Sequence, residues 1–171
     1  MSTRTLASSF AISIAALSAH ESRAGTYGTA AGGTLAGAYD GSASLIAGGE
    51  LSAFQLGSAP KALPDGLVNF LGGEGYAWAG GYTEIVRDVA AHATRVSIGP
   101  EVGAGIFGVD AGALFELSHG DAPGRAGATI RLAARLGLGQ IYARYNHYVD
   151  DQPGTNAIEL GLLIKIPYWS R

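Results

Sequence analysis

The chain has 171 residues, of which 47% are hydrophobic, 15% are charged and 27 are glycine, and its formal net charge is −3. The hydrophobic share excludes an intrinsically disordered chain, which combines low hydrophobicity with high net charge. The scattered positive charges exclude a nucleic-acid-binding stripe, and the absence of cysteine excludes disulfides and thiolate zinc sites.

The N-terminal segment has the features of a secretory signal peptide. Arg4 precedes an apolar stretch from Thr5 to Ala19, and the small-x-small pattern Ser22-Arg23-Ala24 follows. We predict a signal peptide over residues 1–24 and a barrel domain over residues 25–171, with an amphipathic helix as the alternative for the first segment. The apolar stretch is shorter than the ~20 residues of a transmembrane helix, so a membrane-spanning part would have to consist of strands.

Small residues dominate the next part of the chain, and three strands are predicted there. Their ranges are Thr26–Tyr39, Ala43–Gln55 and roughly Val68–Tyr82. Asp40-Gly41 predicts a tight two-residue hairpin between the first two strands, and Gly57–Gly66, with two prolines, predicts a longer connection.

The segment from Val86 to Ala93 fits either a short helix or an extended approach to the next strand. Beyond it, apolar and polar residues alternate, which places them on opposite faces of a strand. This alternation predicts five further strands, over Arg95–Gly105, Val109–Leu117, Ala128–Gly137, Gln140–Tyr148 and a final stretch from Glu159 to Tyr168. Pro100 predicts a bulge or an interrupted ladder in the first of them.

The chemistry of the polar face indicates where that face points. Acids and bases on it nearly cancel, and the rest is largely Gly, Ser, Thr and Ala, which suits the narrow lumen of an eight-stranded barrel. We therefore predict an all-β fold, an eight-stranded antiparallel up-and-down transmembrane β-barrel with apolar rows facing lipid. Its predicted lumen ion-pair network comprises Glu50, Arg95, Glu101, Asp110, Glu116, Arg131, Arg135, Arg144, Glu159 and Lys165. The alternative is that these charges line a pathway for ions or small solutes.

The C-terminal stretch supports the membrane interpretation. Glu159 to Ile166 has the form polar-x-Gly-x-x-hydrophobic-x-hydrophobic, and Tyr168-Trp169 follow. This pattern resembles the β-signal that the outer-membrane assembly machinery recognises, although Ser170 and Arg171 follow the aromatic pair. Further aromatic residues are candidates for interfacial girdles, namely Tyr76, Trp78, Tyr82, Tyr142, Tyr145 and Tyr148.

A second resemblance concerns chemistry. His147-Tyr148-Val149, then Gln152-Pro153, Ile158-Glu159 and Lys165-Ile166-Pro167, resemble the C-terminal end of the lipid A deacylase family. That family has a His-x-Ser pair on one strand and a Glu on the next, which implies catalytic roles for His147 and Glu159. Val149 occupies the serine position, so no hydroxyl is present for a histidine to activate.

These observations predict a small barrel in the outer membrane of a Gram-negative cell, with a structural, adhesive or ligand-recognition role through its outer loops. Partners expected from this prediction are outer-membrane lipid and, during insertion, the assembly machinery; nucleic acid is not expected, and no protein partner is predicted. We expect no cofactor, and no metal, because the histidines lack ligand spacing. The alternatives are a lipid-modifying enzyme that uses His147 and Glu159, and a soluble exported barrel that binds an apolar ligand inside.

We also predict an orientation from the connection lengths. Connections near Glu84–Ala93, His119–Gly127 and Asp150–Asn156 would lie outside the cell, together with the short Asp40-Gly41 turn, and the turns at Phe107 and Leu138 would face the periplasm.

Overall fold

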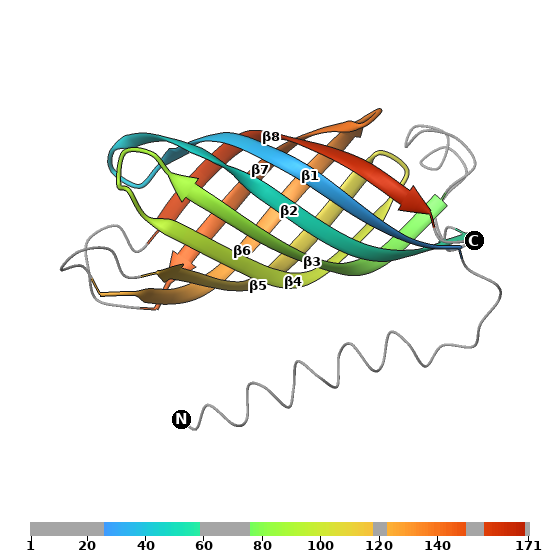
Figure 1. The fold of residues 1–171 in the computed structure, drawn as a ribbon, viewed down its shortest axis with the longest axis horizontal. Coiled ribbons are helices and arrows are strands. Elements are labelled where there is room, and N and C mark those ends of the chain that lie inside the picture. The colour runs from blue at the N-terminus through green and yellow to red at the C-terminus, as the bar shows by residue number, and fades with distance from the viewer. Residues whose placement is uncertain (1–25, 59–75, 118–122, 150–155, 170–171) are drawn as a thin grey trace, which may run out of the picture.

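The computed structural model describes residues 26–58, 76–117, 123–149 and 156–169. These residues form eight antiparallel strands that pair in sequence order and close into a barrel where β1 meets β8 (Figure 1). The strands are β1 (Thr26–Tyr39), β2 (Ala43–Ser58), β3 (Tyr76–Asp88), β4 (Thr94–Ala104), β5 (Phe107–Leu117), β6 (Arg125–Leu136), β7 (Gly139–Tyr148) and β8 (Asn156–Trp169). The predicted eight-stranded antiparallel barrel is confirmed, whereas the predicted signal peptide lies outside the described residues.

Most predicted strands match the structure within a few residues, but β3 does not. It was predicted to end at Tyr82, and it runs on to Asp88 because Glu84, Val86 and Asp88 continue the inward-facing set of alternate residues. The helix considered over Val86–Ala93 is therefore wrong. A turn follows β3, in which the Asp88 carboxylate accepts hydrogen bonds from two backbone N–H groups of the turn.

Pro100 interrupts a ladder without shifting its register. Ile98 pairs with Ala113 and Glu101 pairs with Asp110, whereas Gly99 and Pro100 between them make no pair with β5. The spacing is equal on the two strands, so this site is an interruption and not a bulge. Proline has no N–H to donate to a ladder, which accounts for the gap.

The connections divide between the two ends of the barrel. The loop end carries the turns at residues 40–42 and 89–93 and the ends of β5 and β7. The termini end carries the start of β1, the end of β8 and two-residue turns at Gly105-Ile106 and Gly137-Leu138, where both glycines have positive φ. The connections predicted to lie outside the cell are grouped at the loop end, and the two turns predicted to face the periplasm are grouped at the termini end. The first hairpin turn has three residues instead of the predicted two.

The outer surface of the barrel is apolar. Leucine, isoleucine and valine side chains from every strand point outward, and the charged partners at alternate positions are buried inside. A soluble barrel has the opposite distribution, with an apolar interior and a charged surface. The observed distribution is that of a transmembrane barrel.

Aromatic side chains form two outward-facing girdles. Near the termini end are Tyr27, Phe107 and Tyr168, and near the loop end are Tyr39, Phe115 and Tyr145. Tyr27 and Tyr39 lie twelve residues apart on β1, about 40 Å along a strand at ~3.3 Å per residue and about 30 Å along the axis at a tilt of ~40°. That spacing matches the ~30 Å thickness of the hydrocarbon core of a bilayer.

Four of the aromatic residues considered for the girdles point inward instead. Tyr82, Tyr142 and Tyr148 are buried, and Trp78 lies on the same face of β3 as Tyr82, next to a lumen arginine. Each of them lies an even number of residues from an inward-facing charged residue on its own strand. Alternate residues of a strand share a face, so these rings point into the lumen. Only Tyr145 and Tyr168 of the described candidates belong to the girdles, since the side chains of the remaining two are not described.

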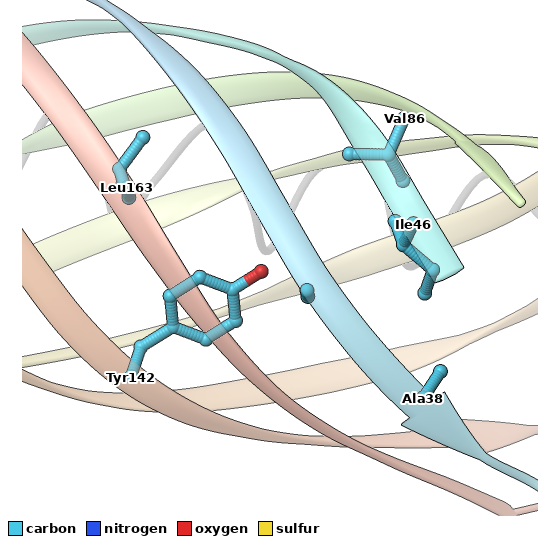
Figure 2. Close-up of a cluster of buried hydrophobic side chains, with 6 residues drawn as sticks. Ala38, Ile46, Val86, Tyr142 and Leu163 are labelled. Atoms are coloured by element: carbon cyan, nitrogen blue, oxygen red, sulfur yellow. The ribbon is translucent and has the colours of Figure 1, made fainter. Parts of the chain in front are cut away.

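A small apolar cluster fills one side of the lumen. Side chains from β1, β2, β3, β7 and β8 gather there (Figure 2), namely Ala36, Ala38, Ile46, Val86, Tyr142 and Leu163. A Cβ at Gly161 would lie 2.6 Å from the Tyr142 ring, so glycine is needed for the ring to lie there. Within the described ranges, no helix is long and apolar enough to cross a membrane.

Candidate functional site

The strongest concentration of chemistry is a set of charged side chains inside the barrel, which we name the lumen network. Each member is less than 9% exposed, a degree of burial that charged residues rarely reach unless they are paired. The members come from seven of the strands: Glu50, Glu84, Arg95, Glu101, Asp110, Arg131, Arg144, Glu159 and Lys165.

Arg131 lies at the centre of the lumen network. Its Nη1 is 2.6 Å from a Glu50 carboxylate oxygen, and its Nε donates to Asp110 Oδ2 at 2.7 Å. Glu84 lies farther away, at 3.7 Å. The guanidinium also lies over the rings of Tyr82 and Tyr142, so one cation on β6 contacts side chains of β2, β3, β5 and β7.

Toward the loop end, two arginines share one carboxylate. Arg144 Nη1 lies 2.5 Å from Glu84 and 3.4 Å from Glu159, and Arg95 Nη1 donates to Glu159 at 2.6 Å. Asn146 donates a further hydrogen bond to Glu159. Glu159 is fully buried and receives hydrogen bonds from three side chains, so its charge is compensated within the lumen.

Toward the termini end, Lys165 completes the network. Its Nζ forms an ion pair with Glu50, donates to Glu101 at 2.8 Å and donates to the Ser52 hydroxyl at 2.8 Å. Acids and bases thus alternate from Lys165 through Arg131 to Arg95. Oppositely charged groups in contact offset each other's charge, and their side chains fill much of the narrow interior of an eight-stranded barrel.

Eight of the ten predicted lumen residues lie in this network. Arg135 also faces the interior, but its guanidinium lies 4.5 Å from the centre of the Trp78 ring instead of in an ion pair with a described residue. Glu116 lies nearer the loop end, where it accepts a hydrogen bond from the Tyr148 hydroxyl at 3.1 Å.

The sequence interpretation missed Glu84, which links the two halves of the network. The sequence pattern places it in a connection, because the predicted third strand ends at Tyr82. The missed signal was parity: Glu84 lies two residues beyond Tyr82 and therefore on the same face of a continued strand. It also accepts hydrogen bonds from the hydroxyls of Thr34 and Ser97.

The two candidate catalytic residues lie on opposite faces of the barrel wall. Glu159 is buried in the lumen, whereas His147 is exposed on the outer surface, where its Nδ1 lies 2.9 Å from Asn156 Oδ1. The structure does not bring them together, because residue 147 has the outward parity of Tyr145 and residue 159 the inward parity of Lys165. Among the described residues, no group of three or more His, Asp and Glu is placed to hold a metal ion.

No family model matches the chain, and no curated protein sequence matches it. Among solved structures, the chain is similar to Ail, the attachment invasion locus protein of Yersinia pestis, in a crystal structure with the heparin analogue sucrose octasulfate. The identity is 8% and the TM-score 0.23, over 83% of this chain and 99% of that chain. At this level of similarity, what Ail binds implies nothing for this chain.

Proposed function

We propose that this chain is an outer-membrane barrel that acts as a rigid, closed scaffold and displays its loop end to the outside of the cell. Its role there is structural, adhesive or ligand-recognising. The single observation that carries the proposal is the inside-out distribution of side chains, with apolar rows and two aromatic girdles outside and paired charges within.

The closed lumen argues for a scaffold in preference to a pore. Ile46, Leu114 and Leu163 are fully buried among the paired charges, and the interior of an eight-stranded barrel is just wide enough for side chains to fill or for one small ligand, not for an aqueous channel. The position of His147 and Glu159 on opposite faces argues against the lipid-modifying enzyme. The charged interior argues against a soluble barrel that carries an apolar ligand.

Heat-modifiable migration tests the membrane barrel. We expect the protein to fractionate with the outer membrane and, without boiling, to migrate on a detergent gel at a different apparent mass from the boiled sample, because a closed barrel resists detergent until it is heated. Recovery in a soluble fraction after detergent-free lysis, with one gel position for both samples, would contradict the proposal.

Epitope insertion tests which end faces outward. We expect a short tag inserted after Gly41, in the loop-end turn, to bind antibody on intact cells. The matched insertion after Gly105, in a termini-end turn that also has a glycine with positive φ, should bind antibody only after permeabilisation. The reverse labelling pattern would invert the orientation and move the recognition surface to the termini end.

A further inference from the structure

A small cavity lies in the lumen at the termini end, next to the Lys165 end of the lumen network. Its volume is about 80 Å³, or room for about five water molecules at ~15 Å³ each. Residues from seven strands and one turn line it, and those used below are Phe54, Trp78, Glu101, Arg135, Gln140 and Lys165.

Arg135 differs from the four cations of the lumen network. Arg95, Arg131, Arg144 and Lys165 each lie within 2.8 Å of a carboxylate oxygen. The Arg135 guanidinium forms no ion pair or side-chain hydrogen bond with the described part of the chain, yet it lines the cavity. Glu101 lines the same cavity and attracts this guanidinium, but the N–H donors of Arg135 bond to no described side chain and stay available to something that enters the cavity.

Trp78 holds this guanidinium in place. The indole lies against Gly103 and Gly108, where a Cβ would overlap or crowd the ring, and Arg135 lies over the ring at 4.5 Å. Stacking occupies the face of a guanidinium and leaves its planar set of N–H donors free for a bidentate acceptor. The arrangement is thus preorganised for a planar oxyanion.

The other cavity walls define the rest of the ligand. Lys165 forms ion pairs with Glu101, at 2.8 Å, and with Glu50, so its ammonium group is already engaged. Gln140 supplies a buried amide, and Phe54 supplies an aromatic wall. One free cationic fork, one amide and an apolar wall fit a singly charged group attached to a short apolar body.

We propose that this cavity binds a small organic carboxylate of about three or four carbons. The carboxylate accepts hydrogen bonds from the Arg135 guanidinium and from the Gln140 amide, and the carbon chain lies against Phe54. This site goes beyond the proposed scaffold role and does not depend on it, because the cavity belongs to the barrel whichever end faces outward.

Titration with sodium butyrate tests the proposal. The protein is folded in a neutral detergent and carries Trp169→Phe, so that Trp78 is the one remaining tryptophan. At constant ionic strength, we expect butyrate to change the Trp78 emission with a saturating curve, and uncharged butyramide, which has the same shape, to leave it unchanged.

Variants locate the response. Arg135→Gln should weaken butyrate binding by about tenfold or more, the effect of losing a hydrogen bond to a charged group, and Arg135→Lys should weaken it less, because lysine keeps the charge but loses the fork. Arg87→Gln, on the outer surface, is the matched control and should bind as the parent does. Heat-modifiable migration shows that each variant is folded, and Arg135→Lys keeps the test in force if Arg135→Gln does not fold.

Two results would overturn the proposal. An unsaturated response, or one that Arg135→Gln and Arg135→Lys leave unchanged, would show that butyrate does not bind at Arg135. Inorganic phosphate binding as tightly as butyrate would show that the site reads anionic charge alone and not the carboxylate with its carbon chain.

Discussion

Replacing Arg131 by methionine will lower the free energy of unfolding of the barrel by about 3–5 kcal/mol, the range for removing one partner of a buried ion pair. Arg131 Nε is the donor to Asp110, and Nη1 lies 2.6 Å from Glu50. Glu50 keeps Lys165 in the variant, whereas Asp110 loses the one cation with which it forms an ion pair among the described residues. Denaturant unfolding in detergent, followed on a gel by the loss of the unboiled form, measures the change.

Two matched variants separate charge from packing at Arg131. Arg131→Met with Asp110→Asn removes the unpaired carboxylate along with the cation, so we expect it to recover part of the loss. Arg87→Met, at an exposed arginine that donates to Thr94 on the outer surface, should change stability by less than about 1 kcal/mol. Equal stability of Arg131→Met and the parent would show that the lumen network does not hold the barrel together.

The fold was predictable from the sequence because one physical pattern repeats along most of the chain. Arg131 and Arg135 alternate with Ile130 and Leu132, and a strand must place these two sets on opposite faces. The near balance of acids and bases then indicated which face is enclosed. Errors arose where side chains are small or mixed, as in β3, where alternation is weak before Tyr82 and the strand continues to Asp88.

The site was less predictable, because parity says which residues share the lumen but not which of them meet. Lys165 on β8 reaches Glu101 on β4 across the barrel, and Arg95 on β4 reaches Glu159 on β8. Such pairs depend on strand register and tilt, which alternation does not encode. The free guanidinium of Arg135 was hidden for the same reason: its stacking partner Trp78 looked like a girdle residue until its direction was known.

Replacing Leu162 by arginine tests the direction of the apolar rows, on which the membrane interpretation depends. Leu162 points outward near the middle of β8, beside Leu35 and Ile141 on the neighbouring strands, and all three are exposed. In a bilayer, an arginine near the midplane costs about 2–4 kcal/mol, and the cost falls to about 0–1 kcal/mol near the interface. We therefore expect Leu162→Arg to destabilise the protein in phospholipid vesicles by the larger amount.

Two control variants show whether a loss of stability in Leu162→Arg comes from a charge placed in lipid. Leu162→Ala removes the leucine without adding a charge, so it should cost less than Leu162→Arg, and Leu138→Arg, in an exposed turn at the termini end, should cost little. A soluble barrel would tolerate all three changes within about 0.5 kcal/mol, as exposed positions in water usually do. If Leu162→Arg leaves the free energy of unfolding in vesicles unchanged, the apolar rows contact something other than lipid, because hydrocarbon cannot solvate the guanidinium.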